Sequence, residues 1–191
     1  MAQPTYLKNL KAYANSAWPG RPNEPVDVVG AYQAESDRGA IILATTHLED
    51  NLQLAIMAGL PTLQTDELAF RVMFENDGPL ATFSSRIKMA YAMGLADVKS
   101  QKDMDLIRQI RNACAHSRQP ISLDTPELKA AVLALLSDTS DILIRRDAPA
   151  LREAFILHCY MMADNVLQAK AVSARDQILA MVAALGPRTG A

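Results

Sequence analysis

Aromatic residues and cysteines are scarce in this sequence, and both shortages narrow the possible folds. Only 5% of the residues are aromatic although 50% are hydrophobic, so alanine, leucine, isoleucine and methionine carry the apolar content. These residue types favour helices over strands. The two cysteines, Cys114 and Cys159, lie in apolar stretches without the spacing of metal ligands. We therefore expect both to be buried free thiols in a reducing compartment.

Long apolar runs and a surplus of positive charge are missing as well. No stretch reaches the roughly 18 to 20 apolar residues of a membrane span, and the N-terminus lacks the pattern of a signal peptide, so we expect a cytoplasmic protein outside the membrane. The chain has 19 Lys and Arg against 21 Asp and Glu. Because basic side chains on phosphates supply most of the affinity of DNA-binding domains, this balance argues against tight binding of duplex DNA by the chain alone.

Turn and capping signals divide the chain into helices, and the period-two alternation of strands is absent. We predict a first helix over residues 5–17, a long second helix from about residue 26 to 58, and a last long helical region over about 148–185. Shorter helices between them are opened by capping residues, namely Thr65, Thr82 and Thr125. The sequence thus predicts an all-α fold in which residues 1–191 form a single domain, a multi-helix bundle with short connections.

Four charged residues form a predicted polar cluster where the helical pattern expects the core. Glu35 and Arg38 fall within the apolar stripe of the second helix, with Asp37 to one side, and Arg111 lies about 40° from the apolar Ile107 on a later helix. An isolated buried charge costs several kcal/mol, so we expect Glu35 or Asp37 to contact Arg38 or Arg111 across the helix pair. Two interpretations stay open: a polar lock that sets the helix register, or a functional site.

The three histidines show no metal-binding pattern. His47 and His158 are predicted to be interior or boundary residues, whereas His116 ends a helix, where the helix dipole favours its charged form. They are far apart in the sequence, and no cluster of Cys, His and acidic residues has ligand spacing. We therefore predict no metal site and no cofactor.

The segment from residue 77 to 95 carries a family resemblance. A turn with Gly78 and Pro79 is followed by Arg86, Lys88 and Tyr91. Together with the order of a long helix, this turn and helix, and an Arg-containing helix that ends in His, it resembles the mannitol operon repressor family. The resemblance covers roughly residues 28–128, and the first and last helical regions are expected to pack on this core. It implies a helical regulator of transcription of a sugar-alcohol operon.

A helix-turn-helix pair with a basic recognition helix is not found. The nearest match, residues 84–88, is interleaved with residues typical of a packed helix. Repression is then expected to run through a protein partner, such as another transcription regulator. We also expect a homo-oligomer, because the last helical region offers additional apolar side chains: Phe155, Met161, Met162 and Val166.

An alternative function comes from the helix that ends in His116. Arg111, Asn112 and His116 fit the Arg-x4-His pattern and resemble HEPN-type helical ribonucleases, which implies RNA cleavage without a metal. The ribose 2′-hydroxyl would attack the adjacent phosphate, with His116 as general acid or base, Arg111 stabilising charge on the phosphate and Asn112 orienting the substrate or His116. Since Arg111 and His116 diverge by about 140° on a regular helix, a distorted helix end or a second subunit is required. The regulator is the main prediction, and the ribonuclease is the alternative.

Overall fold

The computed structural model describes residues 32, 34–137 and 148–184, and this part of the chain is helical, without strands. Its helices are α3 (Asp37–Gly59), α4 (Thr62–Thr65), α5 (Glu67–Phe74), α6 (Phe83–Ala92), α7 (Val98–His116), α8 (Pro126–Leu135) and α9 (Ala148–Ala184). The predicted all-α fold with a long last helical region is confirmed. The helix predicted over residues 5–17 lies outside the described residues.

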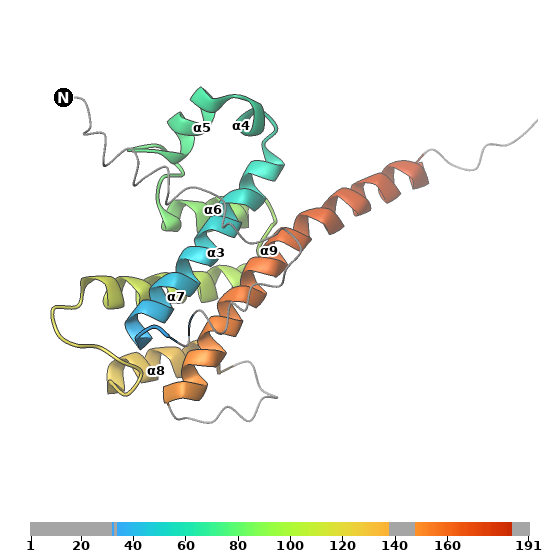
Figure 1. Cartoon of the computed structure of the whole chain (residues 1–191). Helices are drawn as coiled ribbons and strands as arrows, with labels where there is room; N and C mark the ends of the chain where they lie inside the picture. The colour runs from blue at the N-terminus through green and yellow to red at the C-terminus, as the bar shows by residue number, and fades with distance from the viewer. Residues whose placement is uncertain (1–31, 33, 138–147, 185–191) are drawn as a thin grey trace, which may run out of the picture.

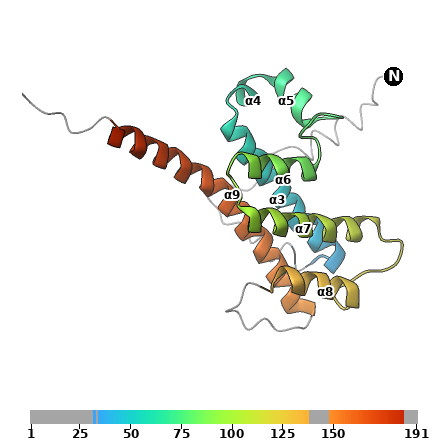
Figure 2. The same ribbon diagram turned by 180° about the vertical axis from the view of Figure 1, so that it is seen from behind.

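Helix α3 lies at the centre of the bundle, and α6, α7 and α9 pack around it (Figure 1). Its buried residues recur every three or four positions, as in a helix that buries one face and exposes the other: Ala40, Ile41, Ala44, Thr45, Leu48, Leu52, Ala55 and Ile56. The short α4 and α5 lie at the C-terminal end of α3, and α8 packs against α7 and α9 (Figure 2).

The two longest helices, α3 and α9, run side by side in the same direction. Asp37 at the start of α3 pairs with Arg152 near the start of α9, and His47, further along α3, stacks on Tyr160 of α9. The C-terminal part of α9 continues past the other helices and projects away from the bundle (Figures 1 and 2). The helix pair therefore forms one side of the bundle.

The second helix begins later than the sequence predicts. Residues 34–36 form a turn, and Ser36 caps α3, because its side-chain oxygen accepts a hydrogen bond from the backbone N–H of Gly39 at 3.1 Å. Such a cap satisfies one of the free amides of the first turn. Glu35 consequently lies before the helix and is exposed. Its predicted place in the buried stripe is wrong.

Capping residues set the starts of the shorter helices. Thr82 caps α6 as the sequence predicts, in a reciprocal capping box with Ser85. Thr125 precedes α8, with Pro126 in its first turn, but the Thr125 side chain makes no capping hydrogen bond. Helix α5 is capped by Asp66 instead of Thr65, because the carboxylate of Asp66 accepts the amide hydrogen of Ala69 at 3.0 Å. Thr65 itself closes the short α4.

The interior contains the residues expected there. Cys114 and Cys159 are buried free cysteines, His158 is buried and His47 is half-buried. Within the described ranges, none of the helices combines the length and apolar character needed to cross a membrane. The same residues contain no group of three or more His, Cys, Asp or Glu side chains arranged to hold a metal ion.

Candidate functional site

The predicted polar cluster is divided between two places in the fold. Asp37 accepts a hydrogen bond from the backbone N–H of Leu123 at 2.8 Å and from Nε of Arg152 at 2.8 Å, and a second guanidinium nitrogen of Arg152 also contacts it. It thereby joins the start of α3 to the loop before α8 and to α9. The expected contact of Asp37 with Arg38 or Arg111 is wrong, because Arg152 occupies that carboxylate.

Arg38 and Glu35, on either side of Asp37, make hydrogen bonds to α7 and α9. Arg38 donates from Nη2 to the carbonyl oxygen of Ala115 at 2.9 Å, in the last turn of α7, where carbonyl groups lack helical partners. The backbone carbonyl of Glu35 accepts a hydrogen bond from Arg152 at 3.1 Å. Glu35, Asp37 and Arg38 therefore lie at the junction of α3, α7 and α9.

Arg111 faces a different acid. It lies one helical turn before Ala115 on α7 and therefore meets α3 further along, within electrostatic range of Glu49. Its Nη1 donates to the side-chain oxygen of Asn112 at 3.2 Å. Its Nε is buried and has no hydrogen-bond partner among the described residues. Arg111 is thus the member of the predicted cluster that keeps an unsatisfied donor.

A cavity of about 280 Å3 lies beside Arg111, and we call it the polar cavity. It is formed by α3, by the start of α6 and by α7. Its lining residues are Glu49, Ala81, Thr82, Phe83, Ser84, Arg108, Arg111 and Asn112. Polar and charged side chains from three elements therefore converge on one space.

The three residues of the Arg-x4-His pattern do not all reach this cavity. Arg111 and Asn112 line it, whereas His116 is exposed at the end of α7 and is not a lining residue. Within a single chain, the imidazole of His116 and the guanidinium of Arg111 therefore do not line the same cavity. The geometric requirement for a distorted helix end or a second subunit remains.

Arg86 is the buried centre of the segment that carries the family resemblance. Only 8% of it is exposed, and its Nε donates to the carbonyl oxygen of Leu80 at 2.9 Å. Its Nη1 lies 3.3 Å from the carboxylate of Glu49, and its guanidinium carbon lies 5.4 Å from the ring centre of Phe74. Burial raises the pKa of the Glu49 carboxyl, while the positive charges of Arg86 and Arg111 oppose this rise.

The turn before α6 requires glycine at position 78. A Cβ atom on Gly78 would lie 2.4 Å from the carbonyl oxygen of Val72 and 2.6 Å from that of Met73. These are backbone atoms that cannot rotate away. In contrast, the remaining motif residues Pro79, Lys88 and Tyr91 are exposed.

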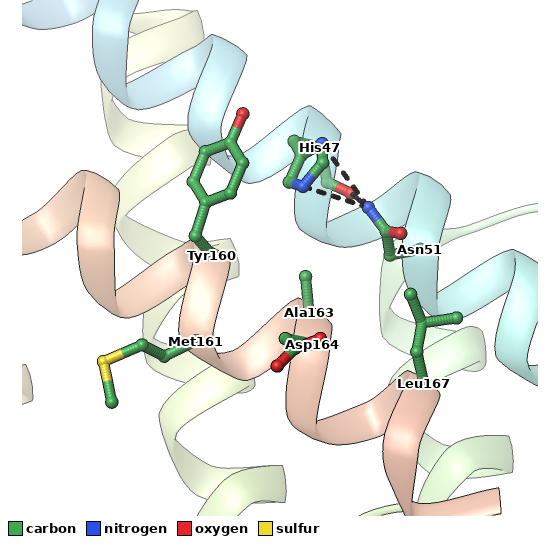
Figure 3. Close-up of a pocket in the computed structure, with 7 residues that line it drawn as sticks. All are labelled: His47, Asn51, Tyr160, Met161, Ala163, Asp164 and Leu167. Atoms are coloured by element: carbon green, nitrogen blue, oxygen red, sulfur yellow. Dashed lines mark hydrogen bonds between the residues drawn. The ribbon is translucent and has the colours of Figure 1, made fainter. Parts of the chain in front are cut away.

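A second cavity, of about 450 Å3, lies between α3 and α9, and we call it the α3–α9 cavity (Figure 3). The ring of His47 stacks on Tyr160 with centroids 4.1 Å apart, and the Tyr160 hydroxyl lies 3.0 Å from that of Tyr32. Burial lowers the pKa of His47, and burial together with the Tyr32 hydroxyl raises the pKa of Tyr160. Both groups are therefore uncharged near neutral pH. The other lining residues are Asn51, Met161, Ala163, Asp164 and Leu167.

Comparison with known proteins places these features in a family. A family model described as mannitol repressor matches residues 64–169, which is more than half of the chain. The chain belongs to the mannitol repressor family. Neither the curated proteins nor the solved structures contain a match.

The match to the mannitol repressor family includes most of the two sites. It begins in α4 and ends within α9, so it contains the turn at Gly78, the buried Arg86 and the α6 and α7 walls of the polar cavity. It shares residues 64–128 with the resemblance seen in the sequence, and it extends beyond it into α9. Helix α3, which contributes Glu49 and His47, precedes the matched region.

Sequence reasoning did not find several residues of these sites. Glu49 follows the buried Leu48, and this position beside the apolar stripe could have indicated a partly buried carboxylate. Ser84 lies in the segment that carries the family resemblance but was not expected to line a site, and Arg108 carried no signal of its own. Arg152 is 115 positions from Asp37, so no periodicity in the sequence connects them.

Proposed function

We propose that this member of the mannitol repressor family regulates transcription by binding a protein partner, without tight binding of duplex DNA by itself. The observation that carries this proposal is an apolar face formed by α3 and α9. We call it the two-helix face, and its members are exposed large hydrophobic residues. Met161 and Leu167 line the α3–α9 cavity, and Leu43, Leu54 and Leu157 lie three or four positions from its lining residues His47, Asn51 and Met161, on the same helix faces.

The exposure of this face is substantial for side chains of this size. Leu54 is 54% exposed, Leu157 52% and Met161 53%. On α3, Leu43, His47 and Leu54 recur at helical spacing, so they form one stripe beside α9. Exposed apolar groups gathered around a hollow are typical of protein-binding surfaces.

The charges on the two-helix face indicate the chemistry of the partner. Asp50 on α3 and Asp164 on α9 are exposed among the apolar residues, and Glu153 is exposed near the start of α9. Among the described side chains, this face has acidic but no basic members. We infer that the partner presents an amphipathic helix whose apolar stripe is flanked by Lys or Arg.

The apolar side chains of the last helix that were expected to support self-association are mostly buried. Phe155, Met162 and Val166 are core residues with 0%, 6% and 2% exposure, and Met161 is the exposed member of that set. In the described part of a second copy, the same face offers no complementary positive charge. We therefore assign the two-helix face to a different protein.

The nearest match to a DNA-recognition helix exposes a single basic side chain among its described residues. In α6, Arg86 is buried and hydrogen-bonded to Leu80 and close to Glu49, which leaves Lys88 as the exposed basic residue of that helix. Recognition helices place several side chains against base edges and phosphates. This supports repression through a partner.

The experiment compares a variant on the two-helix face with a matched variant elsewhere. Leu157→Glu places a negative charge on the face, and Leu68→Glu makes the same change at a leucine of α5 that is 70% exposed. In cells that carry a mannitol-operon reporter, we expect Leu157→Glu to lose regulation and Leu68→Glu to retain it, with unchanged melting temperatures for both. Equal regulation by the two variants contradicts the assignment of the face.

A DNA-binding measurement tests the other half of the proposal. We expect no salt-sensitive binding of the purified chain to a duplex operator fragment at submicromolar concentration and physiological salt. Tight binding under these conditions refutes a mechanism that depends on a partner. If sedimentation shows a dimer that Leu157→Glu dissociates, the occupant of the face is a second copy, and the assignment to another protein is wrong.

A further inference from the structure

Arg111 holds a buried donor that the described chain leaves unsatisfied. Its Nε has no hydrogen-bond partner, and Nη1 bonds only to the amide oxygen of Asn112 at 3.2 Å. No carboxylate of the described residues lies within ion-pair distance of it. A buried donor without a partner lowers stability. This Nε is closed to water-sized molecules, so a ligand reaches Arg111 through the part of its side chain that lines the polar cavity.

Other residues that carry donors line the polar cavity beside Arg111. Arg108 bonds through Nε to Asp105 at 3.1 Å, and its side chain lines the polar cavity. At the start of α6, the Thr82 cap uses the amide of Ser85, whereas the amides of Phe83 and Ser84 belong to the first turn and lack helical acceptors. The N-terminal end of a helix also carries partial positive charge. Two guanidinium groups and a helix start therefore surround this space, a combination suited to a phosphate group.

Acceptor groups lie on the other walls of the polar cavity. The carboxylate of Glu49 lies 3.3 Å from Nη1 of Arg86, so the positive charge of Arg86 balances its negative charge. Its carboxylate oxygens, the amide of Asn112 and the hydroxyl of Ser84 can bind hydroxyl groups. At about 280 Å3 the cavity has more room than a phosphate group alone would fill.

We propose that the polar cavity binds a small phosphomonoester of a polyhydroxy compound. Arg108, Arg111 and the first amides of α6 bind the phosphate, and Glu49 and Asn112 bind hydroxyl groups. Such a ligand bridges α3, α6 and α7 and stabilises their packing. This site is separate from the two-helix face, and its test does not depend on the partner.

Calorimetric titration of the full chain tests the ligand class with three probes: glucose 6-phosphate, inorganic phosphate and glucose. We expect glucose 6-phosphate to bind with one site per chain and at least about tenfold more tightly than inorganic phosphate, because only it engages both sets of groups. Glucose alone is expected not to bind measurably. If neither phosphate compound binds at millimolar concentration, the proposal is wrong. If inorganic phosphate binds as tightly as glucose 6-phosphate, the site is an anion site only, and the polyhydroxy part of the proposal is wrong.

Two variants locate the site without relying on a single side chain. Arg111→Gln removes a cation, and Ser84→Asp adds a negative charge in the first turn of α6, where an acid is compatible with the helix dipole and the fold is retained. Both are expected to weaken glucose 6-phosphate binding by at least about tenfold. Arg118→Gln, at an exposed arginine after α7, is the matched control and should bind as the wild type does. Equal binding by Ser84→Asp and the wild type places the ligand elsewhere and refutes the proposal.

Discussion

Replacing Arg86 by methionine tests whether the buried Arg86–Glu49 pair holds α6 against α3. The two side chains are 10% and 17% exposed, and Arg86 also donates to the carbonyl of Leu80. Methionine keeps most of the apolar length but leaves the Glu49 carboxylate and the Leu80 carbonyl without this partner. Breaking a buried pair from one side typically costs about 3–5 kcal/mol. For a chain of this size, that loss lowers the melting temperature by about 6–20 °C.

The pH dependence of this loss identifies its cause. Burial already raises the pKa of Glu49, and Arg86 opposes the rise, so removing Arg86 raises the pKa of folded Glu49 further. A group whose pKa is higher in the folded state stabilises the fold fully below its unfolded pKa, and this contribution is lost as the pH rises through the folded pKa. The ordinary pKa of glutamate is about 4.3. The destabilisation of the variant relative to the wild type should therefore be smaller near pH 4.5 than at pH 7, where the unfolded chain has lost this proton.

Urea unfolding followed by circular dichroism measures these free energies. Adding Glu49→Gln to Arg86→Met removes the unpaired charge and should recover part of the loss, with a coupling energy of about 0.5–3 kcal/mol. Arg71→Met is the matched control, because Arg71 is 59% exposed in its contacts with Glu67 and Glu75, and exposed pairs contribute only about 0–1 kcal/mol. If Arg86→Met costs no more than Arg71→Met, or if its cost does not change with pH, the reasoning is refuted.

Three further predictions concern other parts of the fold. Gly78→Ala should destabilise the chain by about 1–3 kcal/mol, because its Cβ meets backbone oxygens. Gly39→Ala, whose Cβ meets side-chain atoms of Glu35 and Ser36 and no backbone atom, should cost less in the same unfolding assay, and the reverse order would contradict this. Asp37→Ala should lower the free energy of unfolding by about 3 kcal/mol, because it leaves Arg152 and the backbone amide of Leu123 unpaired. Asp37→Asn keeps an acceptor oxygen for that amide and should cost less; equal losses in the same unfolding assay would show that the contact with the Leu123 amide is unimportant. Metal-free protein in EDTA is expected not to cleave single-stranded RNA, because His116 does not line the polar cavity; cyclic-phosphate products that disappear in His116→Ala would establish the ribonuclease alternative.

The sequence by itself determined the fold class and most of the buried stripe of α3. Helical periodicity and capping are local properties that depend on residues three or four positions apart. For this reason Thr82 at α6, the proline at the start of α8 and the length of α9 could be predicted. The family resemblance around Gly78 and Arg86 also rests on a continuous segment, and the family match contains it.

Only the tertiary structure decided which charged groups meet. Asp37 could have paired with any arginine on a neighbouring helix, and the parallel packing of α9 on α3 selected Arg152, 115 positions away. The packing of α7 against α3 and α6 separates Arg111 from the start of α3 and places it beside Glu49 and the first turn of α6. Helix phase gives the direction of a side chain about its own axis, but the crossing point of two helices depends on how all their side chains interdigitate. That collective packing is why the polar cavity and the two-helix face appear only in the folded chain.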